Sequence, residues 1–240
     1  MPHFFVDEEI ESKEYSLFGE DGRHIAKSLR MKEGENLTLC SPSGTVHNCV
    51  VHKVEGDFVE VSILSSEQSR AEPSVEVTLY QALPKGDKME FIIQKAVEIG
   101  VTEIVPVISS RCVSRPDQKS LSKKLLRWQK IAKQAAMQSG RGIVPKVRNA
   151  VSFEKGVENA NGEKVIFYEL GGESVRDILS DKPKEISIFI GSEGGFSSGE
   201  VDLVLKNGGR KATLGKRILR AETAPLVALS VIMYETDNLE

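Results

Sequence analysis

The sequence predicts an α/β protein in two parts, a small all-β module followed by a larger domain in which helices cover a parallel sheet. Two observations lead to this prediction. Up to about residue 64, short apolar runs alternate with turn signals such as "SPSG" (41–44), as in a β-barrel or β-sandwich. After residue 74, strand-like runs alternate with helical runs, which is typical of a parallel sheet.

The amino-terminal module is expected to span residues 1–70. Its predicted strands are "HFFVD", "NLTLC", "TVHNCVVHKV" and "DFVEVSIL". One short helical stretch, "GRHIAKSLR" (22–30), interrupts them. The polar segment 65–73 ends in proline and has few apolar residues, so we expect it to be the linker to the second domain.

The second domain is expected to span residues 74–240. Its predicted strands are 75–83, 101–109, 164–170, 185–191 and 211–215. The helix after the first strand has Asp87 and Glu90 at capping-box spacing and Gly100 as its stop. Ligands of parallel sheets bind beyond the carboxyl ends of the strands, and three strands here end in the turns "YELGG", "IGSEGGF" and "LGKRILRAET".

The last predicted helix, "APLVALSVIMYE" (224–235), is apolar on nearly every face. A helix of this kind must be buried, either in the core of its own chain or against another subunit.

The composition excludes several classes of protein. A hydrophobic content of 40% and a charged content of 28% are typical of a soluble globular protein. No apolar run approaches the roughly 18 residues of a membrane span, and the acidic amino terminus is unlike a secretory signal. The three cysteines include no CxxC pair, which indicates a reducing cytoplasm and no metal site.

Charge is distributed unevenly along the chain. The net charge is −3, yet residues 111–148 carry 11 Lys or Arg and one acid, so the rest of the chain sums to −13. Within this basic band, residues 120–140 predict a helix with Leu121 and Trp128 on its packing face. We interpret the band as a surface for a polyanion such as nucleic acid. A solvated helix face is the alternative.

The glycine-rich loop "IGSEGGFSSGEV" (190–201) joins a strand to a helix. Ser197 and Glu200 have capping-box spacing, so the helix should begin at about Ser198. The loop matches neither a dinucleotide fingerprint nor a P-loop, and Glu193 would repel phosphate. Glycines allow a ligand to approach the backbone closely. A cationic ligand without phosphate, such as S-adenosylmethionine, therefore fits better, and a turn without a ligand is the alternative.

Further motifs accompany this loop. They are "LGKRILRAETAP" (214–225), "LPKGDKMEFIIQKAVEIGVTEIVPV" (83–107), "QSGR" (138–141) and "HIAKSLRMKEGE" (24–35). In this combination the sequence resembles the RsmE-like family of ribosomal RNA uridine-N3 methyltransferases, which belongs to the SPOUT class. The resemblance covers most of the chain.

The resemblance implies a PUA-like amino-terminal barrel and a carboxy-terminal α/β domain with a trefoil knot. It also implies a cytoplasmic homodimer that binds S-adenosylmethionine in the knot loops. The implied reaction is methylation of N3 of a uridine in bacterial 16S (small-subunit) rRNA, either naked or in the assembled small ribosomal subunit. The chain departs from the usual family pattern at Ser192, Met137 and His3, where proline, glutamate and arginine are common.

The implied chemistry needs no protein nucleophile, because the methyl group on a sulfonium is already electrophilic. The protein must align the reactants and stabilise the anion that forms when N3 loses its proton. Arg220 and Arg217 are the candidates for this, and the alternative for each is a structural ion pair, for example with Glu222. The sequence does not identify the general base. Glu193 would face the cofactor's cation or accept donors within the turn.

The expected contacts form two groups. The expected cofactor-binding residues are Leu170, Ile190, Gly191, Glu193, Gly194, Gly195, Leu214, Gly215, Ile218 and Leu219. The expected RNA-binding residues are Arg23, Lys27, Arg30, Arg111, Arg115, Lys123, Arg127, Lys130 and Arg141. Two other functions remain open: a non-catalytic rRNA-binding assembly factor with a relic pocket, and a SPOUT enzyme that methylates a ribose 2′-hydroxyl.

Overall fold

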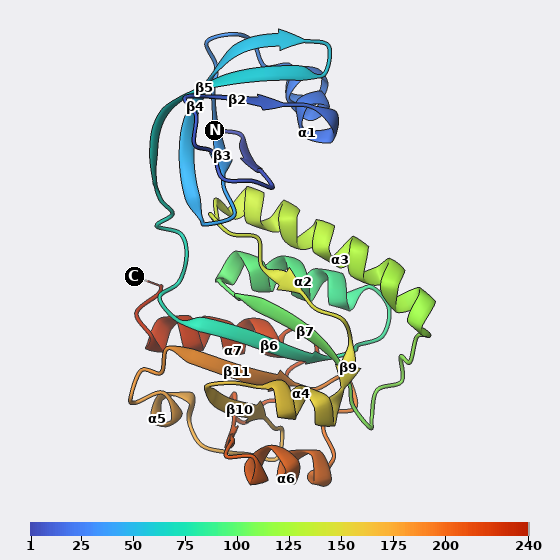
Figure 1. The fold of residues 1–240 in the computed structure, drawn as a ribbon. Helices are drawn as coiled ribbons and strands as arrows, with labels where there is room; N and C mark the ends of the chain where they lie inside the picture. Colours follow the sequence, from blue (N-terminus) through green and yellow to red (C-terminus); the bar gives the residue numbers. More distant parts are fainter. Residues whose placement is uncertain (240) are drawn as a thin grey trace. The chain divides into compact units, whose positions relative to one another are not determined.

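The computed structural model describes residues 1–239, which divide into two compact units (Figure 1). The first unit consists of Met1–Glu72 together with Ala136–Val144. The second consists of Pro73–Ala135 and the chain from Pro145 onward. The segment 136–144 therefore returns to the first unit, which the sequence ranges 1–70 and 74–240 did not anticipate.

The first unit is built on a five-stranded sheet with the strand order β1-β3-β4-β5-β2. β1 pairs in parallel with β3, and the other pairs are antiparallel. The strands are β1 (His3–Phe5), β2 (Glu14–Leu17), β3 (Asn36–Cys40), β4 (Thr45–Glu55) and β5 (Phe58–Gln68). β2 was not predicted. β5 continues to Gln68, so the prediction that all of 65–73 is linker was wrong for its first four residues.

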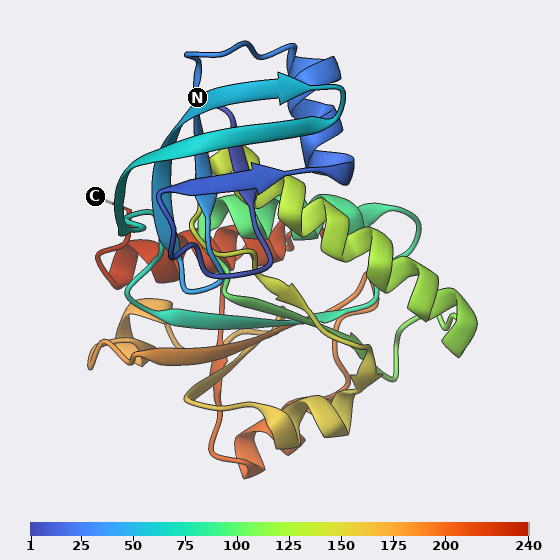
Figure 2. The same ribbon diagram turned by 45° about the horizontal axis from the view of Figure 1, so that its top comes forward.

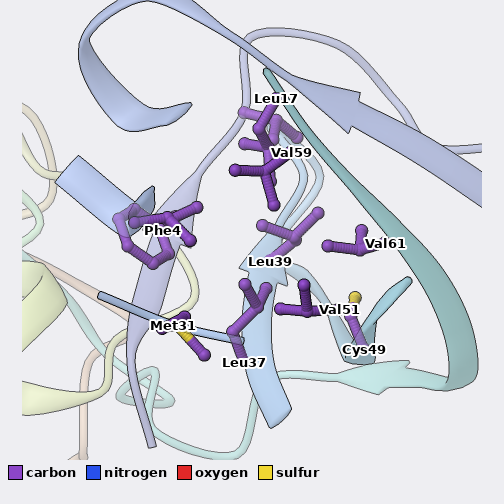
Figure 3. Close-up of a cluster of buried hydrophobic side chains, with 11 residues drawn as sticks. Phe4, Leu17, Met31, Leu37, Leu39, Cys49, Val51, Val59 and Val61 are labelled. Atoms are coloured by element: carbon purple, nitrogen blue, oxygen red, sulfur yellow. The ribbon is translucent and has the colours of Figure 1, made fainter. Parts of the chain in front are cut away.

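The strands bury one face, as the alternation of apolar residues predicts. Cys49 and Val51 of β4 and Val59 and Val61 of β5 point into the same cluster (Figure 3). α1 (Gly19–Arg23) continues directly into the π-helical segment η1 (His24–Leu29). Together they cover most of the run that was predicted to be helical.

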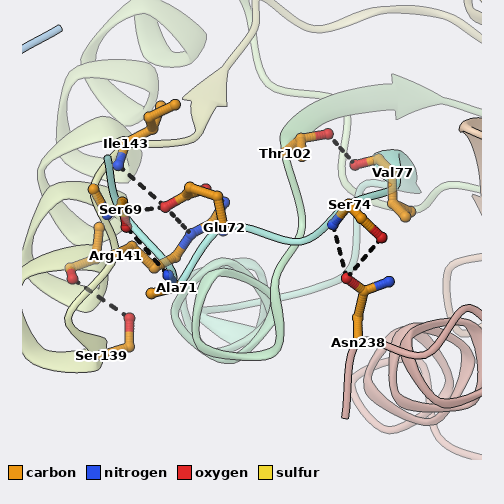
Figure 4. Close-up of polar contacts among 12 residues, drawn as sticks. Ser69, Ala71, Glu72, Ser74, Val77, Thr102, Ser139, Arg141, Ile143 and Asn238 are labelled. Carbon is orange, nitrogen blue, oxygen red and sulfur yellow. Dashed lines mark hydrogen bonds and ion pairs between the residues drawn. The ribbon is translucent and has the colours of Figure 1, made fainter. Parts of the chain in front are cut away.

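The return segment 136–144 is held by polar contacts around one carboxylate (Figure 4). Glu72 accepts hydrogen bonds from the backbone N–H of Gly142 at 2.9 Å and of Ile143 at 3.2 Å. Its other oxygen lies 2.5 Å from Nη2 of Arg141. Met137 packs against the apolar cluster of this unit. The segment is therefore an integral part of the first unit.

The second unit contains a seven-stranded sheet in which every pairing is parallel, as predicted. The strand order is β12-β10-β11-β6-β7-β8, and β9 also pairs with β7. The strands are β6 (Glu76–Ala82), β7 (Glu103–Ile108), β8 (Lys146–Val147), β9 (Val151–Ser152), β10 (Glu163–Phe167), β11 (Glu185–Ile190) and β12 (Arg210–Ala212).

Helices cover both faces of this sheet (Figure 2). α2 and α7 pack together on one face, and α4 and α6 pack together on the other. The helices are α2 (Lys88–Ile99), α3 (Gln118–Ser139), α4 (Phe153–Asn159), α5 (Val175–Ile178), α6 (Ser198–Lys206) and α7 (Ala224–Glu235). α4 and the short strands β8 and β9 were not predicted.

The predicted helix caps are confirmed at two positions and wrong at a third. Ser197 and Glu200 form the predicted reciprocal capping box at the start of α6. Gly100 ends α2 in the left-handed conformation, with φ of 117°. The predicted Asp87 side-chain cap was wrong, because the Asp87 side chain makes no capping hydrogen bond. With ψ of 8°, Asp87 lacks the extended backbone that normally directs a cap side chain toward the helix.

Candidate functional site

A cavity of about 510 Å³ opens at the carboxyl ends of β10, β11 and β12. Residues 167–169, 190–195 and 213–221 form most of its wall. β10 lies between β12 and β11 in the sheet, so the turns that follow these strands meet although they are far apart in sequence. A cavity in this position is the expected ligand site of a parallel sheet.

The glycine-rich loop after β11 is folded tightly, and several of its contacts leave no room for a side chain. A Cβ atom on Gly191 would lie 3.0 Å from the Cα atom of Gly195, and one on Gly194 would lie 2.9 Å from Cβ of Arg111. Gly195 has a φ of +63°, which glycine adopts without strain. Its backbone N–H donates to the carbonyl of Ser192 at 2.9 Å.

Two buried side chains stabilise the loop and the start of α6 through hydrogen bonds. Gln81, at the end of β6, donates its amide N–H to the carbonyl of Ala82 at 3.0 Å and to that of Gly191 at 3.3 Å. Glu200 accepts from the backbone N–H of Ser110 at 2.7 Å in addition to capping α6. These bonds connect the loop to the end of β6 and the start of α6 to the turn after β7, so the wall of the cavity is held in a defined conformation.

The Glu193 carboxylate has two protein partners, Lys88 and the backbone of Lys85. Its Oε1 atom lies 2.8 Å from Nζ of Lys88, and it accepts from the backbone N–H of Lys85 at 3.2 Å. Burial acts to raise the pKa of Glu193, but the Lys88 pair and the backbone donors outweigh it and hold this pKa below its usual value. These donors come from outside the glycine turn, and Glu193 also lines the cavity, so a contact with the cofactor stays a prediction.

Arg217 and Arg220 both line the cavity, and both are exposed. Within residues 1–239 neither guanidinium takes part in an ion pair or a side-chain hydrogen bond. Glu222, the anticipated structural partner, lies 3.1 Å from Nζ of Lys88; backbone hydrogen bonding, Lys88 and the nearby charge of Arg220 all act to lower the pKa of Glu222. Both arginines are therefore available to a ligand.

Nine of the ten expected cofactor-binding residues line this one cavity. Leu170 does not, because β10 ends at Phe167 and the following turn leaves the Leu170 side chain 77% exposed. Its neighbour Glu169 lines the cavity in its place. Glu169 belongs to the "YELGG" turn, which follows a predicted strand, so its place at the cavity could have been predicted. Nothing in the sequence linked Lys88 to this site.

The basic residues expected to bind RNA differ in their availability. Lys123 and Lys130 are exposed on α3, but Arg127 lies 2.7 Å from Glu90 in an ion pair. Arg111 donates to the carbonyl of Gly194 at 3.1 Å, and Arg115 donates to that of Ser110 at 3.1 Å. Each of these two arginines therefore already has a backbone partner.

Arg141 does not fit its expected role. Its guanidinium is buried against Glu72, and the residue is only 3% exposed. The structure speaks against an RNA contact by Arg141, since a phosphate would have to displace a buried ion pair.

Three basic residues of the first unit lie on or directly after its short helical segments. Arg23, Lys27 and Arg30 are all exposed there. Arg23 lies 3.8 Å from Asp57, a distance typical of a weak surface pair. All three side chains are therefore accessible to a ligand that binds beside these helical segments.

No group of three or more His, Cys, Asp or Glu side chains in residues 1–239 is arranged to hold a metal ion. The three cysteines are buried and free. Burial raises the pKa of Cys40 to about 12 and that of Cys49 to about 11, so both remain thiols at neutral pH. In the same part of the chain, no helix has the length and apolarity needed to cross a bilayer.

Comparisons with known proteins identify the class of fold. Residues 71–233 match the model of an RNA methyltransferase domain, and residues 18–64 match that of an RNA methyltransferase PUA domain. The Ribosomal RNA small subunit methyltransferase E of Bacillus subtilis is 36% identical over 252 residues, covering 100% of this chain and 98% of that protein.

Solved structures agree. A Ribosomal RNA small subunit methyltransferase E from Neisseria gonorrhoeae, bound to S-adenosyl methionine, is 34% identical with a TM-score of 0.89, covering 98% of this chain and 97% of the other. A putative methyltransferase from Legionella pneumophila in complex with SAM is 33% identical with a TM-score of 0.88, covering 97% and 96%. The chain therefore belongs to the ribosomal RNA small subunit methyltransferase E family, which confirms the resemblance read from the motifs.

Proposed function

We propose that the protein uses S-adenosylmethionine to methylate small-subunit ribosomal RNA, at N3 of a uridine. The observation that supports this most directly is the cavity itself. It brings the glycine loop after β11 and the two unpaired arginines, Arg217 and Arg220, to the carboxyl ends of parallel strands. Relatives that share the fold over nearly the whole chain bind this cofactor or carry this activity in their names.

The residues of the cavity fit this cofactor. A volume of about 510 Å³ lies in the range of small-molecule sites. Gly191, Gly194 and Gly195 let the loop fold tightly against its own backbone, Arg111 and Glu169, so that main chain forms this wall of the cavity. The carboxylates of Glu169 and Glu193 face a ligand there. They would repel a polyphosphate, whereas the cofactor carries no phosphate and has a net positive charge.

The chemistry divides between cofactor and protein. When bound, the cofactor supplies a methyl group on an electrophilic sulfonium. The glycine loop and the segment 213–221 would hold that group in line with N3 of the uracil ring. Arg217 and Arg220 would stabilise the negative charge that remains on the base once N3 has lost its proton. Both guanidinium groups have their donors available for this role.

The basic side chains outside the cavity would bind the RNA backbone. We propose Lys123 and Lys130 of α3 as the phosphate contacts in the second unit. Arg23, Lys27 and Arg30 would serve in the first unit. Arg111, Arg115 and Arg127 would contribute only by exchanging their present partners for phosphate.

We also propose that the protein is a homodimer that associates through α7. Tyr234 on this helix is 66% exposed, and Leu226, Val227 and Val231 are only partly buried. A second subunit would cover these side chains. The oligomeric state in solution tests this proposal.

Two further features are proposed from the family. A knotted path of the chain is proposed from the family resemblance alone, and main-chain tracing in an experimental structure would test it. Three free, buried cysteines suit a reducing cytoplasm. Fractionation of cells would test that location.

One experiment separates this function from its alternatives. Purified protein is incubated with S-adenosylmethionine that carries an isotopically labelled methyl group, together with naked small-subunit rRNA or with assembled subunits. Mass spectrometry of the nucleosides should then show labelled 3-methyluridine. A label on ribose would indicate a 2′-O-methyltransferase. Tight rRNA binding without any transfer would indicate an assembly factor, and either result would contradict the proposal.

A further inference from the structure

The cavity is lined by two carboxylates in very different surroundings. Glu193 is paired with Lys88 at 2.8 Å and receives the backbone N–H of Lys85. Its carboxylate therefore has protein partners, although Lys88 is shared with Glu222. Glu169 also lines the cavity, but within residues 1–239 its carboxylate makes no ion pair and no hydrogen bond.

The position of Glu169 is defined by the glycine loop. The Glu169 carboxylate lies over the backbone of Gly195, with Oε1 only 2.7 Å from the place that a Cβ atom on Gly195 would occupy. The absence of a side chain at Gly195 thus lets a solvent-exposed carboxylate without a protein partner rest against the loop that forms the cavity wall. An unpaired carboxylate at this place would be stabilised by a cationic ligand.

The charges of the cofactor indicate which of its groups the Glu169 carboxylate would attract. The ammonium and carboxylate of its amino acid end compensate each other, so the sulfonium is the uncompensated cation. Methyl transfer breaks the bond between sulfur and methyl carbon and leaves the electron pair on sulfur. The product, S-adenosylhomocysteine, is therefore a neutral thioether that otherwise keeps every group of the cofactor.

We propose that Glu169 faces the sulfonium and selects the charged cofactor against its neutral product. This inference rests on the proposed function, because it assumes that the cavity binds S-adenosylmethionine. Glu169 would then favour binding before the reaction and release after it, since the attraction disappears with the methyl group. Glu193 is less suited to this distinction, because its carboxylate is already held by the ammonium of Lys88 at 2.8 Å.

The test compares two dissociation constants in each of three proteins. Calorimetry gives the constants for S-adenosylmethionine and S-adenosylhomocysteine with the wild-type protein, with Glu169→Gln and with Asp202→Asn. Asp202 is an exposed residue of α6 outside the cavity, so its variant controls for the change in net charge. Circular dichroism confirms that each variant is folded.

For Glu169→Gln we expect the preference for S-adenosylmethionine to fall about three- to fivefold, the order of a partly exposed charge pair. The affinity for S-adenosylhomocysteine should change less than twofold, and Asp202→Asn should behave like the wild type. An equal loss for both ligands would overturn the proposal, because Glu169 would then bind a group that both share. Unchanged affinities would also overturn it. If the wild-type protein bound neither ligand, the proposed function itself would fail.

Discussion

The Nζ atom of Lys88 lies 2.8 Å from Oε1 of Glu193 and also contacts Glu222 at 3.1 Å. Lys88 is the first residue of α2, Glu193 follows β11, and Glu222 precedes α7. One ammonium group therefore connects two loops that lie next to the same cavity. Its pKa is raised, chiefly by the hydrogen bonds to these carboxylates, so it is charged at every physiological pH.

Replacing Lys88 by Met should weaken cofactor binding by about three- to tenfold, because the two loops would repel each other through unpaired carboxylates. Calorimetry measures the affinity. Lys95→Met is the matched control, since Lys95 lies on the same helix and, within residues 1–239, forms its ion pair with Glu98. Equal affinities in the wild-type protein and the Lys88 variant would show that the bridge does not position the loops.

The sequence predicted the part of the site that has local signals. The glycine loop, the capping box at Ser197 and the turn before α7 each lie on a contiguous stretch, and in a parallel sheet such stretches meet at one edge. Lys88 and Glu169 were missed for different reasons. Lys88 contacts Glu193, about a hundred residues away in sequence, and no local pattern indicates such a contact. Glu169 and Leu170 are adjacent in one turn, and a turn has no periodicity that predicts which of the two side chains faces the cavity.

The fold was predictable to a similar extent. Alternating strands and helices predicted the parallel sheet, because apolar runs such as that of β11 are buried on both faces. The return of residues 136–144 to the first unit could not be predicted. It depends on Glu72 receiving Arg141 and two backbone N–H groups, which is a long-range interaction without a sequence pattern.

Substituting valine at Gly195 should abolish detectable S-adenosylmethionine binding in calorimetry. A β-branched residue is strained at a φ of +63°, and its Cβ would collide with the Glu169 carboxylate. The matched control is Gly199→Val in the first turn of α6, where a Cβ meets nothing within 4 Å. Circular dichroism should show both variants folded. Wild-type affinity in the Gly195 variant would remove this loop from the site.

The first unit should lose stability in mild acid because of His47. This side chain is buried between the hydroxyl groups of Ser41, at 2.9 Å, and Ser66, at 2.8 Å. Burial lowers its pKa below 6.5, although the charge of Glu9 acts in the opposite direction. The unfolded state therefore binds a proton more readily, so the free energy of unfolding should fall as the pH drops below about 6.5.

Denaturant titrations between pH 5 and 8 measure this effect. His47→Gln should have a flatter pH dependence in this range, whereas His52→Gln, at an exposed position on the same strand, should retain the wild-type slope. Identical slopes for the wild-type protein and the His47 variant would mean that another group is responsible.

The proposed dimer should depend on the exposed side of α7. Tyr234→Glu places a charge on a surface that a second subunit would bury, so the protein should become monomeric at micromolar concentration in light scattering. Leu205→Glu on α6 is the control, because Leu205 is also an exposed apolar residue of a helix. A wild-type protein that is already monomeric would contradict the dimer.

The last prediction concerns RNA. The triple variant Lys123→Ala, Arg127→Ala, Lys130→Ala should bind RNA more weakly whatever its sequence, and should keep normal cofactor affinity because none of the three residues lines the cavity. Most of the effect should come from Lys123 and Lys130. Arg127 is paired with Glu90 at 2.7 Å, so its contribution is already partly neutralised.

The salt dependence distinguishes phosphate contacts from a general loss of charge. Each lost contact should reduce the slope of log affinity against log salt concentration by roughly 0.7 to 0.9. The double variant Lys123→Ala, Lys130→Ala should therefore show a slope smaller by roughly 1.5. The control is Lys184→Ala, Lys206→Ala, which removes the same charge from exposed positions away from α3. If both double variants bound RNA like the wild-type protein at every salt concentration, the basic face of α3 would be only a solvated surface. RNA recognition would then rest on Arg23, Lys27 and Arg30 of the first unit.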